Sequence, residues 1–505
     1  MNIPIHVGLT SARILRLIAA AVLLVLAGRA FPAYGRTGTI LHSFDGAPDD
    51  GRLPYAGLVQ GSDSNFYGTT YQGGSNDYGT IFRVSPSGSY TTLYSFAGPP
   101  NDGGFPWAPL VQSADNNFYG TTYAGGTSTN CGYGCGTIFR ISPGGVYTTL
   151  YSFAGYPDDG FRPKAGLVEG SDSNFYGTTE WGGSSGAGTL FRIDSSGTYT
   201  ILYSFGSTPP HDGMNPQAGL TLGSDSNFYG TTAFGGAYME GTMFRITPSG
   251  SYSILHSFGF SNLDDGSQPQ GNLVQGSDSN FYGTTRTGGI STNGTIFRIS
   301  PGGAYTNLYS FAGSPSDGSY PAAPLVQGSD GNLYGTTVLG GRHGHNPGIP
   351  GEGTVFRISP SGVYTNLCSF GSSSGDGKSP FGGLILGSDG DFYGTTSAGG
   401  AHHDNGTLFK FAIGAGGICA YTLNPTSVTL GARGGLRRVH VKVQNADCVW
   451  TAVSNDSFIT ITAGTNGVGK GTVTYTTPAN TSTNVLTGTI TIAGGTFTVT
   501  QSGQK

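Results

Sequence analysis

The sequence is poor in charged residues. Of its 505 residues, 23 are Lys or Arg and 28 are Asp or Glu, so charged side chains make up 10% and the formal net charge is −5. No cluster of Lys and Arg is present that could neutralise a row of phosphates. This composition argues against nucleic acid as a partner.

Long apolar runs and helical periodicity are also scarce. The one long apolar stretch covers residues 17–27, follows Arg13 and Arg16, and is followed by small residues up to Gly35. This order is typical of a secretory signal peptide, which we place at residues 1–35. An uncleaved membrane anchor is the alternative, but the run is about half of the roughly 20 residues that a span needs. We expect a secreted or cell-surface protein with no membrane span in its mature chain.

Cysteine is rare, with five residues in the chain. Cys131 and Cys135 share one Gly-rich loop, CGYGC, and Cys419 and Cys448 lie in the C-terminal segment. In an exported protein these four residues predict two disulfides. A metal site at Cys131 and Cys135 is the alternative, but no third or fourth ligand stands near them, so we predict neither a metal nor a cofactor. Cys368 replaces the Tyr or His of the other repeats and is predicted to be a buried free thiol.

Glycine is abundant instead, with 90 residues, and it is accompanied by many Thr, Ser, Tyr and Phe residues. Gly-rich turns with β-branched and aromatic residues between them predict many short strands, and therefore an all-β fold. The tetrapeptide Y-G-T-T recurs seven times at intervals of 52 to 59 residues, each time within the same longer phrase. The copies begin at Tyr67, Tyr119, Tyr176, Tyr229, Tyr282, Tyr334 and Tyr393.

Each repeat contains four apolar or alternating runs, separated by three turn signals: G-S-D-S-N, a Gly-Gly loop and S-P-S-G. Four strands in a unit of this length are typical of a propeller blade, so we predict a seven-bladed β-propeller over residues 36–414. The last repeat lacks its fourth strand, whereas residues 37–44, TGTILHSF, supply one at the start. This N-terminal strand is predicted to complete the last blade and close the ring. The alternative is an open array with an arbitrary repeat phase.

Alternate connections of a meander emerge on the same side, so the Gly-Gly loops share a face with the D-G-x-x-P connections. Between Y-G-T-T and the next G-T lie eight residues in four repeats, but thirteen in the second and fifteen in the sixth. Variable loops on a repeated frame are where binding usually occurs. Aromatic residues beside Gly pairs suit stacking on sugar rings or other flat partners; the alternative is that they fill the mouth of the central channel. The candidate binding residues are Tyr71, Tyr123, Trp181 and Phe234, with Arg286 in the fifth repeat.

Two kinds of charged residue recur in every repeat. The Asp of each D-G-x-x-P connection raises the question of calcium, but a D-G turn explains it without a metal, since calcium takes six or more oxygens. The basic residue of each G-T-[ILMV]-F-[RK] phrase is predicted to pair with a loop acid such as that Asp. The acids are Asp50, Asp102, Asp159, Asp212, Asp265, Asp317 and Asp376, and the basic residues are Arg83, Arg140, Arg192, Arg245, Arg298, Arg357 and Lys410.

The phrases SDGNLYGTTVLGG and GEGTVFRISPSGVYTNLCSF, with their sister copies, resemble the GloVer tandem-repeat family of exported bacterial proteins over about residues 37–411. This resemblance implies an exported protein with no assigned catalytic activity. The phrases CAYTLNPTSVTLGARGG and LTGTITIAGGTFTVTQSG look like a BACON-type immunoglobulin-like β-sandwich, which we place at residues 415–505. The second resemblance implies a module that binds carbohydrate or mucin, or one that acts as a spacer. Within it, Trp450 is predicted to pack in the core against a Cys419–Cys448 disulfide.

Catalytic signatures are not found. Nearly every polar residue recurs sevenfold, and there is no G-x-S-x-G elbow, H-E-x-x-H motif or phosphate loop. We therefore predict a non-catalytic extracellular protein that recognises carbohydrate or another surface polymer through the variable-loop face, with the C-terminal domain as a second place for binding. Two alternatives remain open: a structural or adhesive envelope protein with no small ligand, and a polysaccharide-active enzyme whose carboxylates come from different blades.

Overall fold

The computed structural model describes residues 38–207, 212–259, 264–342, 351–373, 375–412, 421–443, 449–468, 470–493 and 495–504. Every regular element in these ranges is a β-strand, as the composition predicts. The described residues include no helix of the length and apolarity that a membrane span requires. The predicted signal peptide (residues 1–35) and the predicted partners Cys419 and Cys448 lie outside these ranges.

The described repeats build seven four-stranded antiparallel sheets. In the first sheet the order is β3 (Val59–Gln60), β4 (Phe66–Thr70), β6 (Thr80–Val84) and β7 (Tyr90–Ser95), so consecutive strands are neighbours, as in a meander. The next sheets repeat this order with β9 (Val111–Gln112), β10 (Phe118–Thr122), β12 (Thr137–Ile141) and β13 (Tyr147–Ser152); β15 (Val168–Glu169), β16 (Phe175–Thr179), β18 (Thr189–Ile193) and β19 (Tyr199–Ser204); and β21 (Thr221–Leu222), β22 (Phe228–Thr232), β24 (Thr242–Ile246) and β25 (Tyr252–Ser257). They continue with β27 (Val274–Gln275), β28 (Phe281–Thr285), β30 (Thr295–Ile299) and β31 (Tyr305–Ser310); β33 (Val326–Gln327), β34 (Leu333–Thr337), β36 (Thr354–Ile358) and β37 (Tyr364–Ser369); and finally β39 (Ile385–Leu386), β40 (Phe392–Thr396), β42 (Thr407–Phe411) and β1 (Thr39–Ser43).

A two-stranded ribbon accompanies each of these sheets, formed by the D-G connection and the Gly-Gly loop of one repeat. The pairing places the two loops side by side, as the meander predicts. Further backbone bonds tie each ribbon, such as the one from Gly74 N to Asp50 O (2.8 Å). The ribbons are β2 (Gly51–Arg52) with β5 (Gln72–Gly73), β8 (Gly103–Gly104) with β11 (Ala124–Gly125), β14 (Gly160–Phe161) with β17 (Trp181–Gly182), β20 (Gly213–Met214) with β23 (Phe234–Gly235), β26 (Gly266–Ser267) with β29 (Thr287–Gly288), β32 (Gly318–Ser319) with β35 (Leu339–Gly340), and β38 (Gly377–Lys378) with β41 (Ala398–Gly399).

The first half of Y-G-T-T fixes each strand to its turn and its neighbour. The Tyr67 hydroxyl donates to Asp63 Oδ2 (2.8 Å) in the G-S-D-S-N turn, and the Asn65 side chain donates to the same oxygen (2.7 Å). A β-carbon at Gly68 would lie only 2.5 Å from the Phe82 ring, so no larger residue fits there. The same Tyr–Asp bond joins Tyr119 to Asp115, Tyr176 to Asp172, Tyr229 to Asp225, Tyr282 to Asp278, Tyr334 to Asp330 and Tyr393 to Asp389.

The two threonines of Y-G-T-T connect neighbouring strands and neighbouring repeats. Thr70 Oγ1 and Thr80 Oγ1, on β4 and β6, lie 2.8 Å apart. Thr69 Oγ1 donates to Ala108 O of the second repeat (3.3 Å). The first threonine donates to a carbonyl of the neighbouring repeat in six of the seven repeats, and Thr231 Oγ1 of the fourth repeat has no partner among the described residues. The phrase recurs because its residues make contacts that the sheets share.

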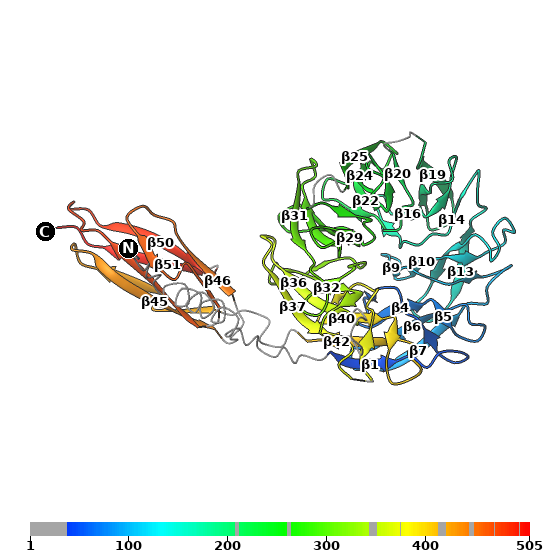
Figure 1. Cartoon of the computed structure of the whole chain (residues 1–505), viewed down its shortest axis with the longest axis horizontal. Helices are drawn as coiled ribbons and strands as arrows, with labels where there is room; N and C mark the ends of the chain where they lie inside the picture. Colours follow the sequence, from blue (N-terminus) through cyan, green and yellow to red (C-terminus); the bar gives the residue numbers. More distant parts are fainter. Residues whose placement is uncertain are drawn as a thin grey trace, which may run out of the picture. The chain divides into compact units, whose positions relative to one another are not determined.

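The last sheet meets the first through the same contacts that join other neighbours. Thr395 of the last repeat donates to Ala56 O of the first (2.8 Å), and the Tyr393 ring lies 4.0 Å from the Phe66 ring, compared with 4.1 Å for the equivalent pair of the first and second repeats. β1 pairs antiparallel with β42, so the N-terminal strand completes the last sheet as predicted. In Figure 1 the sheets follow one another around a ring, with β1 beside β42.

The basic residue of each F-R phrase faces the Tyr–Asp pair and not the D-G connection. Arg83 lies opposite Tyr67 in the register of β4 and β6. In the last repeat Lys410 forms ion pairs with Asp389 (2.9 Å) and Asp391 (2.8 Å), which belong to the turn equivalent to G-S-D-S-N. The predicted pairing with a loop acid is therefore confirmed for Lys410, but the acids belong to this turn, and the D-G Asp given as the example is wrong. The Asp of D-G and the Asp of the G-S-D-S-N turn both lie in predicted loops, and only the strand register shows which of them the basic residue faces.

Residues 421–504 form two further sheets that share one hydrophobic core. One sheet has the order β43 (Tyr421–Asn424), β45 (Gly435–Val443), β49 (Gly471–Thr477) and β47 (Thr460–Ala463); the other has the order β44 (Ser427–Leu430), β51 (Gly495–Gln501), β50 (Leu486–Ile492), β46 (Val449–Ser454) and β48 (Asn466–Val468). Trp450 is buried in this core with Val473 and Phe497, as predicted, and Phe458 packs against them; the predicted disulfide beside Trp450 lies outside the described residues.

Candidate functional site

The Asp of each D-G connection is used by the loop that contains it. Asp102 is buried; its Oδ1 accepts from Gly103 N (2.7 Å), and its Oδ2 accepts from Ala97 N (2.8 Å) and the Tyr94 hydroxyl (2.9 Å). Equivalent bonds hold Asp159 and Asp317, and a His replaces the Tyr at Asp50 and Asp265. These bonds explain the acids as turn-forming residues. In the described ranges no three His, Cys, Asp or Glu side chains are grouped to hold a metal ion.

The residue before each D-G-x-x-P proline has an unusual backbone. Positive φ is uncommon for non-Gly residues, and a residue before Pro normally has an extended conformation. At Phe105, for example, the N–H donates to Tyr78 O of the preceding repeat (2.7 Å), and the carbonyl accepts from Tyr123 N (3.2 Å). These bonds hold the backbone on both sides. The seven residues, with φ between 51° and 58°, are Leu53, Phe105, Arg162, Asn215, Gln268, Tyr320 and Ser379.

Two further positions adjoin this one on the same face. One is the residue after the proline, and the other is the residue after Y-G-T-T, which bonds to the residue before the proline in its own repeat. The backbone is repeated sevenfold, whereas the side chains vary from repeat to repeat. After the proline they are Tyr55, Trp107, Lys164, Gln217, Gln270, Ala322 and Phe381; after Y-G-T-T they are Tyr71, Tyr123, Glu180, Ala233, Arg286, Val338 and Ser397.

Aromatic residues at these positions contact one another across the last, first and second repeats. The Tyr55 ring is stacked on the Trp107 ring at a centroid distance of 4.5 Å and an interplanar angle of 17°. Tyr71 contacts Trp107 edge-on at 5.1 Å, and Tyr123 lies 6.3 Å from it. Phe381 contacts Tyr55 at 5.4 Å. Burial raises the pKa of Tyr55, and burial together with neighbouring tyrosines raises the pKa of Tyr71.

Two cations from the third repeat border these rings. Lys164 Nζ lies 5.0 Å from the centroid of Trp107, and the Arg162 guanidinium lies 5.4 Å from that of Tyr123, both within the range of cation–π attraction. We call Tyr55, Tyr71, Trp107, Tyr123, Arg162 and Lys164 the aromatic–cation cluster.

A hydrogen-bonded chain supports the cluster from the third and fourth repeats. Lys164 Nζ donates to Gln217 Oε1 (3.2 Å), and Gln217 Nε2 donates to Glu180 Oε1 (2.8 Å). Glu180 is buried, with 7% of its surface exposed. Burial lowers the pKa of Lys164; the nearby charge of Glu180 opposes this shift, and that of Arg286 adds to it.

The predicted binding residues fall into two groups. Tyr71 and Tyr123 lie in the cluster, and Arg286 occupies the equivalent position of the fifth repeat, above the Tyr320 ring at 5.8 Å. Trp181 and Phe234 lie one residue further along, in β17 and β23, and neighbouring residues of an extended strand point to opposite sides. Their side chains are 39% and 37% exposed. The structure therefore does not place these two with the cluster.

Sequence reasoning did not identify Tyr55, Trp107, Arg162 and Lys164. The signal was available, because the residues on each side of the D-G-x-x-P proline differ from repeat to repeat while the surrounding phrase is kept. When the residue type at one position varies among repeats of the same backbone, the fold does not require a particular side chain there, and the position is free to take part in binding.

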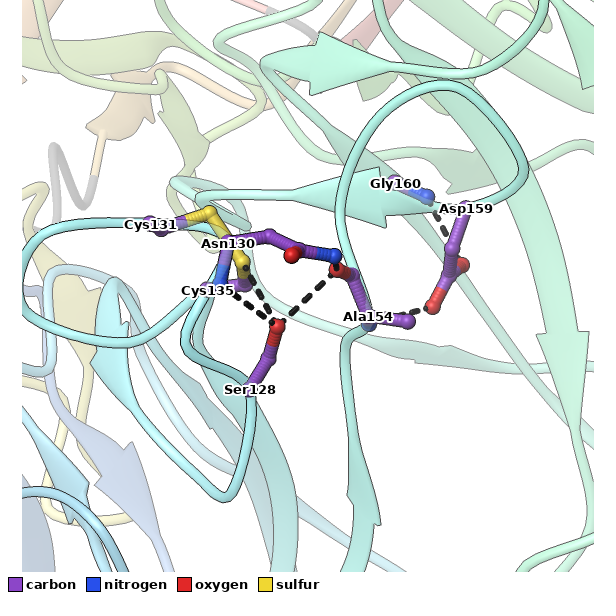
Figure 2. The surroundings of a disulfide bond; sticks show 7 residues. All are labelled: Ser128, Asn130, Cys131, Cys135, Ala154, Asp159 and Gly160. Atoms are coloured by element: carbon purple, nitrogen blue, oxygen red, sulfur yellow. Dashed lines mark hydrogen bonds between the residues drawn. A yellow bond between two sulfur atoms is a disulfide. The ribbon is translucent and has the colours of Figure 1, made fainter.

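The predicted disulfide between Cys131 and Cys135 is formed, and Figure 2 shows its surroundings. Ser128 and Asn130, in the same loop, donate to Ala154 O (3.0 and 2.9 Å). Ala154 N in turn donates to Asp159 of the next D-G connection (2.8 Å), so the disulfide loop is tied to its neighbour (Figure 2). Cys368 is a buried free thiol, as predicted, and burial raises its pKa to about 12.

The sequence matches the Gloeobacter/Verrucomicrobia repeat family over residues 30–224 and 218–438. The chain belongs to this family, which confirms the resemblance of its repeats. No curated protein matches the sequence at a significant level.

Several solved structures show a distant likeness. A xyloglucanase from Bacteroides ovatus is 21% identical with a TM-score of 0.15, and the match covers 17% of this chain and 19% of the xyloglucanase, which is well under two thirds of its length. An ulvan lyase is 8% identical with a TM-score of 0.41, over 74% of this chain and 92% of the lyase. An endo-arabinase from Bacteroides thetaiotaomicron is 12% identical with a TM-score of 0.29, over 55% of this chain and 98% of the arabinase. At these scores the likenesses say nothing about activity.

Proposed function

We propose that this chain is an exported, non-catalytic binding protein whose repeats form a closed seven-bladed β-propeller, and that the aromatic–cation cluster recognises carbohydrate. One observation carries the proposal. A backbone repeated sevenfold gathers Tyr55, Trp107 and Tyr123, with two cations, in one sector of one face. Aromatic rings with polar neighbours suit sugars, which present an apolar face and a rim of hydroxyl groups.

The closed ring is supported by the joining of the last repeat to the first. The bond from Thr395 to Ala56, the contact of Tyr393 with Phe66 and the pairing of β1 with β42 each reproduce a contact found within the array. A closed ring holds the loops of separate repeats at fixed distances, which reduces the ordering cost of binding.

The backbone conformation also supports a binding role. Holding a residue such as Phe105 or Tyr320 at positive φ costs on the order of 1–3 kcal/mol, and such strain is concentrated at functional sites. The bonds between repeats fix that conformation and therefore the direction of each side chain.

A comparison of two double variants tests the proposal. Trp107→Ala with Tyr123→Ala removes two rings of the cluster, and Trp181→Ala with Phe234→Ala removes two exposed rings that lie outside it. Affinities for a panel of soluble polysaccharides should fall at least about tenfold in the first variant and stay unchanged in the second. Circular dichroism of both variants checks that they are folded.

Equal losses in the two folded double variants would contradict the assignment of the site. If the unmodified protein binds no polysaccharide of the panel, the proposed function is wrong, and a structural or adhesive role without a small ligand takes its place. Release of sugar from any polysaccharide by the purified protein would contradict the non-catalytic assignment.

A further inference from the structure

Arg162 and Lys164 have no acid partner among the described residues, unlike Arg52 and Lys378 of the equivalent loops. Arg52 Nη2 lies 2.6 Å from Asp77 Oδ2, and Lys378 Nζ lies 3.5 Å from Asp404 Oδ1. Among the described residues, Arg162 and Lys164 form no ion pair. Arg162 is exposed, and its guanidinium lies over the rings of Tyr123 and Phe161.

Lys164 has unused hydrogen-bonding capacity in a partly buried place. An ammonium group has three donors, and within the described ranges one of them is bonded, to Gln217 Oε1. Glu180 Oε1 accepts from Gln217 Nε2, and within the described ranges the Glu180 carboxylate is neither hydrogen-bonded to Lys164 nor within ion-pair distance of it. Burial lowers the pKa of Lys164 even though the charge of Glu180 opposes this shift, so a further anionic group beside the ammonium would stabilise it.

The sign of the local charge is opposite to that of the whole chain. The chain carries a formal net charge of −5, but the positions before and after the D-G-x-x-P proline and after Y-G-T-T carry Arg162, Lys164 and Arg286, with Glu180 as their acid. Complementary charge at a binding surface selects the partner and speeds its encounter.

We infer that the aromatic–cation cluster recognises an acidic polysaccharide, with a uronate ring stacked on the aromatic side chains and its carboxylate bound by Arg162 and Lys164. This inference rests on the proposed function and adds the class of sugar to it. Arg162 offers a planar fork that matches a carboxylate, and Lys164 offers the donors that the protein leaves free.

Two charge-removing double variants test the inference. Arg162→Gln with Lys164→Gln removes the cluster's cations, whereas Arg52→Gln with Lys378→Gln removes the same charge from ion-paired positions. The probes are polygalacturonate, neutral dextran and dextran sulfate, each at low and moderate salt. We expect polygalacturonate to bind most tightly, to weaken with salt, and to lose at least about tenfold in affinity in the first variant but not in the second.

The outcomes separate the two proposals. Dextran that binds as tightly as polygalacturonate, with no effect of the Arg162 and Lys164 substitutions, overturns the acidic sugar and leaves carbohydrate binding intact. Dextran sulfate that binds more tightly than polygalacturonate overturns the uronate in favour of a sulfated sugar. Absence of binding to all three probes overturns this inference, while the proposed function then depends on the wider panel and its own aromatic variants.

Discussion

At the scale of single residues, the protein separates positions that build the fold from positions that vary. Tyr67 and Gly68 are repeated because their contacts, with Asp63 and with Phe82, are needed in every sheet. The residue before the D-G-x-x-P proline is repeated only in its backbone, which stays at positive φ although the side chain changes from Leu53 to Ser379. Glycine would adopt that backbone without strain. Glycine is absent from all seven positions, which indicates that a side chain at this position has a function.

The strain of a side chain at this backbone position can be measured at Gln268. Gln268 has φ of 55°, whereas Gln270 is not at positive φ. Gln268→Gly should leave the free energy of unfolding unchanged or raise it by up to about 1 kcal/mol, because it relieves strain; Gln270→Gly should lower it by about 1 kcal/mol through the flexibility of glycine in the unfolded chain. Chemical denaturation of both variants gives the two values. A larger loss for Gln268→Gly than for Gln270→Gly would contradict the strain.

At the scale of the element, the carboxylate of each G-S-D-S-N turn holds the strand that follows the turn through a hydrogen bond from its Tyr. Burial by itself would raise the pKa of Asp225, but hydrogen bonds from Asn227 and Tyr229 outweigh it and lower the pKa below the ordinary 3.8. The same holds for Asp63, Asp115, Asp172 and Asp278. A carboxyl whose pKa is lowered by folding stabilises the fold above its unfolded pKa, and this stabilisation is lost as the pH falls through the folded pKa.

Acid should therefore weaken the repeats together. The melting temperature should be steady from neutral pH to about pH 4.5 and fall below pH 4. Asp225→Asn should cost about 1 kcal/mol at neutral pH, because a charged hydrogen bond at a partly exposed turn is lost. The variant and the unmodified protein should converge at low pH, where both side chains are neutral. If Asp225→Asn lowered the free energy of unfolding by the same amount at pH 7 and pH 2, the charge of Asp225 would not contribute to stability.

The strands could be predicted from the sequence more completely than the candidate site. Seven copies of four strands and the N-terminal strand that completes the last sheet follow from the repeated phrases alone. The candidate site could be predicted only in part. Tyr71 and Tyr123, the first residues after Y-G-T-T, lie in the cluster, whereas Trp181 is the second residue after Y-G-T-T and points to the other side of its ribbon. A shift of one residue reverses the side in a strand, and the two-residue ribbons are too short for the sequence to show their register.

At the scale of the whole molecule, the contacts between the first and last repeats determine whether the loops form one surface. Phe381 of the last repeat contacts Tyr55 of the first, so the cluster borders the junction between the repeat that β1 completes and the first repeat. Stability and binding are therefore expected to depend together on an N-terminal segment that lies far in sequence from the end of the array.

Deletion of residues 36–46, together with the predicted signal peptide, tests this dependence. The control is a chain that begins at Arg36 and keeps β1. The shorter chain should melt more than about 5 °C below the control, because β42 loses its neighbour in the sheet, and its affinity for polysaccharide should fall with it. Equal melting temperatures measured by calorimetry would contradict a closed ring.

Tryptophan fluorescence can report on binding at the cluster, since the chain has three Trp residues: Trp107 in the cluster, Trp181 outside it and Trp450 in the C-terminal core. The measurement is a titration of the unmodified protein and of the Trp107→Phe and Trp181→Phe variants with polygalacturonate. If the cluster binds the uronate, emission should change saturably in the unmodified protein and in Trp181→Phe, and should not change in Trp107→Phe. A change that persists in Trp107→Phe and disappears in Trp181→Phe would contradict binding at the cluster.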